Sequence, residues 1–160
     1  MENPLATYLA DHLAGSVQAT EVLKAMQHHH SADVLGEFAA TIFKEVEADR
    51  AILQSLAERV GEGSSSVKEI ASWISEKFSR LKLRQGPKYD LGTFEALEFL
   101  VLGIHGKLLL WNVLSALAPA DPRLGNLDFK SLAGRAEAQR DQVEQRRLQI
   151  AREALGPAAA

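Results

Sequence analysis

The stretch FKEVEADRAIL, from Phe43 to Leu53, lies within a longer run whose apolar residues recur with the period of an α-helix. The apolar positions of that run are Leu35, Phe38, Ile42, Val46, Leu53, Leu56 and Val60. Asp49 falls in the middle of this stripe, and Glu45 falls on its edge. Burying a carboxylate without a partner costs several kcal/mol. Asp49 therefore needs a partner from another helix, and finding that partner is the main question the sequence raises.

The remainder of the chain also predicts helices, and no segment shows the alternation typical of a strand. We expect one all-α domain over residues 1–160, with helices at about 4–27, 32–60, 66–83, 93–118 and 128–155. The predicted N-caps are Asn3, Ser31, Ser66, Thr93 and Asp128. Gly61 is the predicted end of the second helix, and a loop rich in glycine and serine follows it.

The lengths of the connections narrow the topology. Short connections join the first two helices and the last two, so each pair should form an antiparallel hairpin. About thirty residues, including the short helix, separate the two hairpins, which is enough to return along a helix of roughly 38 Å. Two antiparallel helix hairpins joined by a long crossover containing a short extra helix make a ferritin-like four-helix bundle.

Composition excludes several classes of function. The 160 residues carry a net charge of −3 and no run rich in lysine or arginine, so we expect no binding to nucleic acid. Cysteine is absent, which rules out disulfides and thiolate metal ligands. The most apolar stretch, FLVLGIHGKLLLWNVLSALA, is interrupted by His105, Lys107 and Asn112, so we expect a buried helix and no membrane span. With no recognisable signal peptide, the sequence predicts a cytoplasmic protein.

Polar and ionisable residues recur on the inner faces of the last two long helices. Glu98, His105 and Asn112 are spaced by seven residues and share a face with apolar side chains. Arg140 and Arg147, also seven apart, lie in the apolar stripe of the final helix. Guanidinium groups bind carboxylates in pairs of hydrogen bonds. One hypothesis is therefore an internal ion-pair network, in which Arg140 and Arg147 pair with Asp49, Glu45 or Glu98.

The inward carboxylates of FKEVEADRAIL and FEALEFLVLGIHGK, together with the helix order, resemble the ferritin-like superfamily. The run FKEVEADRAILQSLAERVG is similar in cadence to its small bacterial YciF-like branch, which implies a stress-associated role. Members with a di-iron or di-manganese centre use two Glu-x-x-His motifs, and this sequence contains none. The second hypothesis is a degenerate iron or manganese site made from Glu45, Asp49, Glu98 and His105, serving an oxidoreductase or an iron-handling protein.

Three further features bear on partners. The run His28 to His30 is interpreted as an exposed polar turn. Gly103 and Gly106 lie inside a helix, where each costs up to about 1 kcal/mol relative to alanine, so either a neighbouring helix approaches closely or a small-molecule ligand needs the space. The fourth helix is apolar nearly all round, which predicts cover on more than one side, part of it from the crossover helix and the rest from a second copy in a homodimer. The sequence names no substrate or ligand.

Overall fold

The computed structural model describes residues 3–61 and 89–157, and every regular element in these residues is helical. Four long helices are present there, α1 (Pro4–His29), α2 (Val34–Val60), α4 (Leu91–Leu117) and α5 (Phe129–Leu155), with a short 3₁₀ turn, η2 (Pro122–Leu124). Their bounds agree with the predicted ones to within two residues. The helix predicted at 66–83, with its Ser66 cap, lies outside the described residues.

Three of the predicted helix ends are confirmed and two caps are wrong. Asn3 and Asp128 accept hydrogen bonds from the first turns of α1 and α5, and Gly61 ends α2. Ser31 is not a cap, because Asp33 accepts from the N–H of Leu35 at 2.8 Å. Likewise Thr93 is replaced by Asp90, which accepts from the N–H of Thr93 at 2.8 Å. A carboxylate at these positions also interacts favourably with the helix dipole, which a hydroxyl does not.

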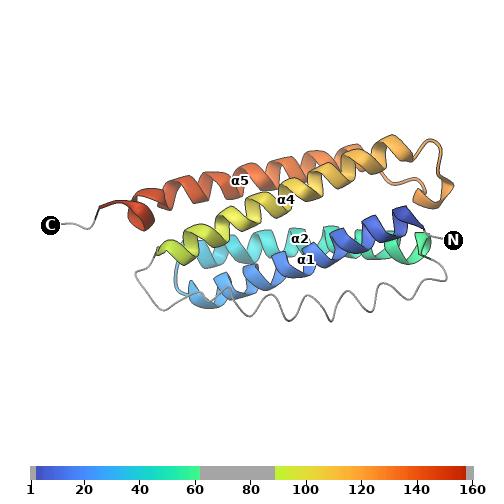
Figure 1. Ribbon diagram of the computed structural model, residues 1–160. Coiled ribbons are helices and arrows are strands. Elements are labelled where there is room, and N and C mark those ends of the chain that lie inside the picture. The colour runs from blue at the N-terminus through green and yellow to red at the C-terminus, as the bar shows by residue number, and fades with distance from the viewer. Residues whose placement is uncertain (1–2, 62–88, 158–160) are drawn as a thin grey trace.

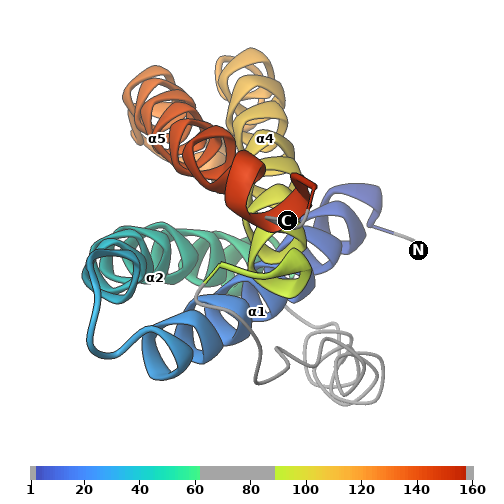
Figure 2. The ribbon, with the colours of Figure 1, turned by 90° about the vertical axis from the view of Figure 1, so that its left-hand side faces the viewer.

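The helices form two antiparallel hairpins, α1–α2 and α4–α5, stacked as two layers (Figures 1 and 2). Figure 1 shows that α2 and α4 run in the same direction, so α2 ends at the end of the bundle opposite the start of α4. The all-α four-helix bundle predicted from the sequence is therefore present.

The two hairpins share one hydrophobic core, whose largest fully buried side chains include Trp111, Leu97 and Leu56. Packing is most extensive within each hairpin, and a smaller contact between α1 and α4 joins the two. On the other side, α2 and α5 are linked by side chains that bridge them. The guanidinium of Arg146 lies 5.1 Å from the centre of the Phe38 ring, and a second bridge involves Asp49.

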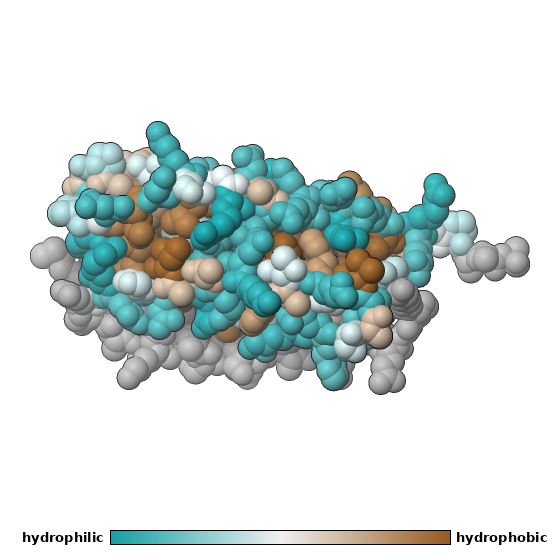
Figure 3. All heavy atoms as spheres, turned by 180° about the vertical axis from the view of Figure 1, so that it is seen from behind, coloured by the Kyte–Doolittle hydropathy of each residue, from teal (hydrophilic) through white to brown (hydrophobic). Residues whose placement is uncertain are grey.

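The surface is mostly hydrophilic on the face seen in Figure 3, with separate hydrophobic regions. The apolar exposure on α4 is concentrated on one side of the helix, in a set that we call the α4 stripe: Leu102, Leu109, Val113 and Leu117. These side chains are between 41% and 67% exposed. Among the described residues, α4 is also the one helix that is long and apolar enough to cross a membrane. Core helices of soluble bundles can have the same length and hydropathy.

Candidate functional site: a buried ion-pair cluster beside a pocket

Asp49 lies near the middle of α2 and is only 1% exposed. The helical phase that placed it among apolar residues is thus correct, and its carboxylate is held by three donors. Lys107 of α4 donates to Oδ2 over 2.6 Å, and Arg135 of α5 donates to Oδ1. The amide of Gln139 lies 3.4 Å from Oδ2. We call Asp49, Lys107, Arg135 and Gln139 the Asp49 cluster.

The Asp49 cluster ties α2, α4 and α5 together at one point. Lys107 also donates to the side-chain oxygen of Gln139, so its ammonium bridges the carboxylate and the amide. Gln139 is 1% exposed and the Lys107 side chain is 14% exposed, whereas the Arg135 side chain is 43% exposed. One carboxylate and two cations leave the cluster with one net positive charge. Charge-assisted hydrogen bonds of this kind satisfy a buried carboxylate at both oxygens.

Burial dominates the electrostatics of Lys107. Desolvation lowers the pKa of its ammonium below 10.5, because the interior disfavours the charged form. The charge of Asp49 and its hydrogen bond to Lys107 raise this pKa, and the charge of Glu45 raises it as well. The positive charge of Arg135 lowers it further. Glu45 therefore acts on this site only through its field. The cluster is a mutually dependent set, since the charge of Lys107 is tolerated chiefly because Asp49 is present.

The predicted ion-pair network is wrong for Arg140, whose ion pairs are not with Asp49, Glu45 or Glu98, and is confirmed for Arg147 with Glu98. Arg140 forms ion pairs with Asp141 at 2.8 Å and with Glu137 at 3.5 Å, and one of its nitrogens lies 3.5 Å from Nδ1 of His105. A helix turns by about 100° per residue. Arg140 is therefore turned away from the direction of Gln139, toward α4 and solvent.

Arg147 follows Arg140 along the same side of α5 and reaches Glu98 of α4. Its Nη1 lies 2.9 Å from Oε2 of Glu98, and its Nε lies 2.7 Å from Glu144. The guanidinium also lies 5.1 Å from the centre of the Phe94 ring. Glu98 is 52% exposed, so this pair belongs to the surface seam between α4 and α5, where ion pairs contribute little to stability.

The structure separates three of the four residues proposed as metal ligands, and the fourth, Glu45, lies one turn before Asp49 on α2. Asp49 lies in the core against two cations, Glu98 lies in the surface seam, and His105 is exposed beside Arg140. The described residues contain no group of three or more His, Asp or Glu side chains that could hold a metal ion. Both oxygens of Asp49 already accept hydrogen bonds from cationic side chains. The donor set for an iron or manganese site is therefore not assembled at Asp49.

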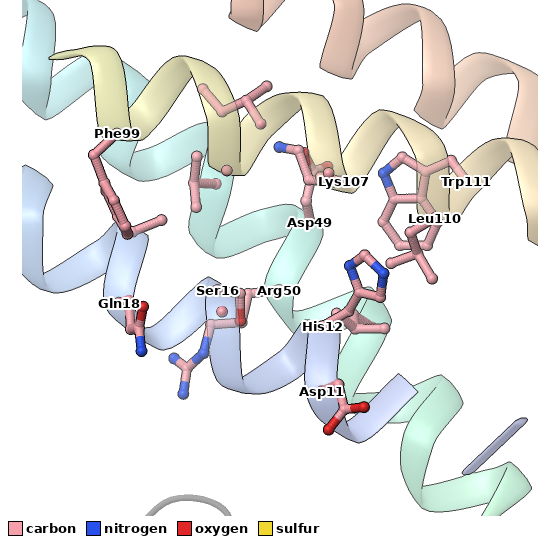
Figure 4. A pocket seen from close by; sticks show the side chains of 17 residues that line it. Asp11, His12, Ser16, Gln18, Asp49, Arg50, Phe99, Lys107, Leu110 and Trp111 are labelled. Atoms are coloured by element: carbon pink, nitrogen blue, oxygen red, sulfur yellow. The ribbon is translucent and has the colours of Figure 1, made fainter. Parts of the chain in front are cut away.

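A pocket of about 440 Å³ opens beside the Asp49 cluster, between α1, α2 and α4 (Figure 4). Asp49 and Lys107 form part of its wall, together with Trp111 and His12. Most of the lining is apolar and includes Leu53, Phe99, Ile104 and Leu110. Its volume is typical of small-molecule sites, which range over about 300–1,000 Å³.

Gly103 and Gly106 line this pocket, and so does Gly15 of α1. A Cβ atom added to any of the three would have no neighbouring atom within 4 Å. Close approach of a neighbouring helix, one of the two explanations offered by the sequence, is therefore wrong for Gly103 and Gly106. The other explanation, room for a ligand, is consistent with their position.

His30 corrects the interpretation of the histidine run. The side chain is buried, with the residue only 3% exposed, and Nδ1 lies 3.0 Å from Asp33 while Nε2 lies 3.2 Å from the hydroxyl of Thr93. Because a carboxylate only accepts, Nδ1 carries a hydrogen and donates it to Asp33, while Nε2 shares a hydrogen bond with the hydroxyl of Thr93. The ring also stacks on Tyr89. A carboxylate, an imidazole and a hydroxyl linked in this sequence also occur in the catalytic triads of hydrolases. Thr93 is fully buried, however, so a substrate cannot reach its hydroxyl. The three side chains instead join the α1–α2 turn to α4.

Three members of the Asp49 cluster were not predicted as its partners. Lys107 interrupts the most apolar stretch of the chain, which was a usable signal for a buried cation. Gln139 is spaced by three from Ala136 and by four from Val143, which was a second signal for the inner face. Arg135 gave no signal, because it is largely exposed and reaches Asp49 with a long side chain.

No protein-family model, curated protein or solved structure matches the chain. Its function has to be inferred from the geometry of its own side chains.

Proposed function

We propose that this chain is a non-catalytic, cytoplasmic bundle of the ferritin-like type, in which the Asp49 cluster takes the place of a di-metal centre. The observation that carries the proposal is the occupation of both Asp49 oxygens by Lys107 and Arg135. The parallel course of α2 and α4, which requires a long connection, supports the ferritin-like topology (Figure 1). The similarity of the α2 sequence to the YciF-like branch supports a stress-associated role.

The chemistry of the cluster explains why a metal is not needed there. A cation binds to a carboxylate that has free lone pairs, whereas those of Asp49 are directed at an ammonium, a guanidinium and an amide. The positively charged neighbours would also repel a divalent ion. In this proposal the cluster fixes the register of α2 against α4 and α5, a role that buried polar groups can serve.

Metal analysis of tag-free protein tests this proposal. Wild-type protein should contain no stoichiometric iron, manganese or zinc by inductively coupled plasma mass spectrometry. Glu98→Gln should unfold at the same temperature as wild type, because Glu98 lies in the exposed seam. A tag-free sample is essential because His28 is exposed and can capture metal adventitiously. Stoichiometric iron or manganese that is lost in both Asp49→Asn and Glu98→Gln would instead establish a degenerate di-metal protein.

We further propose that the bundle forms a homodimer through the α4 stripe. Leu102, Leu109, Val113 and Leu117 extend over roughly 22 Å of the helix and are at least 41% exposed. Between Leu102 and Leu117 the one charged residue is Lys107, which is paired with Asp49, so the stripe carries no charge that a second copy would have to desolvate. A contiguous exposed apolar surface of this kind marks an interaction site.

Light scattering coupled to size exclusion tests the dimer. Wild-type protein should elute with twice the mass of the 160-residue chain, and Leu109→Lys should elute as a monomer. Leu148→Lys is the matched control, because Leu148 is a 58% exposed leucine on α5, outside the stripe. A monomeric wild type, or a dimer that Leu109→Lys leaves intact, would refute the stripe as the interface.

A further inference from the structure

The pocket beside the Asp49 cluster is built at the expense of helix stability. Gly15, Gly103 and Gly106 all lie in helix interiors, where each costs about 0.8–1 kcal/mol relative to alanine. None of them allows a close contact, since an added Cβ at each position would meet open space. Their shared effect is to leave the walls of the pocket without side chains at these points. Gly15 and Gly103 are exposed and Gly106 is half-buried, so a larger side chain at Gly106 would occupy space at the wall of the pocket.

The unpaired polar atoms at this pocket are hydrogen-bond donors. Among the described residues, two buried side-chain nitrogen or oxygen atoms have no hydrogen-bond partner, Nε of Arg50 and Nε1 of Trp111. Both residues line the pocket. Trp111 is 0% exposed, and its indole N–H can only donate. In Figure 4 the indole nitrogen lies on the side of the ring toward Lys107. An unsatisfied buried donor is unfavourable, and a ligand with an acceptor would satisfy it.

The charge next to Trp111 favours an anionic acceptor. The Asp49 cluster carries one net positive charge, and Lys107 uses two of its three N–H groups within the cluster. The carboxylate of Asp49 is fully engaged, so it does not offer an acceptor to a ligand. Away from this end, the lining is formed by apolar side chains such as Leu53, Phe99 and Ile104. One end therefore suits a negatively charged group, and the rest suits a hydrocarbon.

We propose that this pocket binds a small amphipathic carboxylate, such as a medium-chain fatty acid. The carboxylate accepts the indole N–H of Trp111 and lies beside the ammonium of Lys107. The hydrocarbon chain extends over Leu53, Phe99 and Ile104, in the space left open by Gly103 and Gly106. The site shares Lys107 with the Asp49 cluster, but metal analysis tests the role of the cluster and ligand titration tests the pocket, so the two assignments can fail separately.

A series of ligands with one chain length tests the head group. Decanoate, decanol and decylamine are titrated into Trp73→Phe protein, in which Trp111 is the single tryptophan. Decanoate should change the emission of Trp111 in a saturable manner and should bind at least tenfold more tightly than decylamine, with decanol between them. Equal affinities for the three compounds would overturn the carboxylate assignment. No saturable change with any of them would overturn the pocket as a ligand site.

Variants that fill the pocket test the location. Gly106→Leu places a side chain in the open space and should weaken decanoate binding at least tenfold by isothermal titration calorimetry. Gly134→Leu is the matched control, because Gly134 lies in the interior of α5, outside the pocket, and an added Cβ there also meets no atom. Both variants should retain the helical circular dichroism spectrum of the wild type. If Gly106→Leu is unfolded, Gly103→Leu is used as the pocket variant in its place. Unchanged binding in a folded pocket variant, or equal loss in Gly134→Leu, would refute the proposed location.

Discussion

Replacing Asp49 by asparagine removes one charge from the core and leaves its volume unchanged. The residue is 1% exposed, so no cavity forms and the effect isolates the electrostatic role of the carboxylate. Lys107 then remains buried without its counter-ion, and the new amide group directs N–H bonds at cationic neighbours. Breaking a buried ion pair by removing one partner costs about 3–5 kcal/mol.

The ordinary pKa of Lys107 sets a ceiling on this loss. A lysine with a pKa of 10.5 can be made neutral at pH 7 for about 5 kcal/mol, because each pH unit corresponds to about 1.4 kcal/mol. The penalty for leaving the ammonium unpaired cannot exceed that amount, since the lysine would release its proton first. Lys107 also borders the pocket, where water can reach it. We therefore expect the lower end of the range, about 3 kcal/mol, for Asp49→Asn.

Urea unfolding followed by circular dichroism at 222 nm measures this loss. A loss of about 3 kcal/mol lowers the melting temperature by roughly 6–12 °C in a chain of this size. Glu58→Gln, an exposed acid on the same helix, should change stability by less than about 0.5 kcal/mol. Arg135→Met should lose under about 1 kcal/mol, because the Arg135 side chain is 43% exposed and its charge is screened.

The double variant gives the sharpest check. Asp49→Asn combined with Lys107→Met should be more stable than Asp49→Asn alone, because the unpaired ammonium is gone. Lys107→Met on its own completes the cycle and yields the coupling free energy of the pair. The reasoning is refuted if Asp49→Asn loses less than about 1 kcal/mol, or if adding Lys107→Met lowers the stability further.

Three other expectations concern the turn, the pocket and the surface. Gly36→Ala should lose about 1–3 kcal/mol in urea unfolding, because its Cβ would collide with the carbonyl oxygen of His30. Burial lowers the pKa of His12 below 6.5 against the field of Asp11, so nuclear magnetic resonance should give a midpoint below 6.5. Stability contributed by His12 is complete above pH 6.5 and is lost as pH falls through its folded pKa. Arg147→Met should change stability by under about 1 kcal/mol in thermal melts, because Glu98 is exposed.

The fold and the position of Asp49 could be predicted because both depend on local periodicity. Apolar spacing located the helices, and connection lengths indicated the two hairpins. Asp49 lies where its helical phase placed it, near the centre of the core. The N-caps at Asp33 and Asp90 were missed because several capping residues stand close together, and only the geometry of the turn decides among them.

The partners of Asp49 could not be predicted in the same way, because they depend on the rotation of α5 against α2. The apolar stripe of α5 is wide enough that Gln139 and Arg140 both appear to face inward, although 100° separates them. The structure resolves this choice in favour of Gln139. Arg135 adds a second difficulty, since a long side chain can reach the core from an exposed position.

The cluster and the pocket depend on the same feature of the bundle, an interior that is not filled at its centre. A fully packed core would bury Lys107 completely and would raise the penalty for its charge. The pocket instead leaves its side chain 14% exposed, while Asp49 compensates the charge from the other side. Gly103 and Gly106 maintain that access at a measurable loss of helix stability. A chain whose interior served only packing would gain stability by replacing these glycines with alanine, so their presence is consistent with occupation of the pocket.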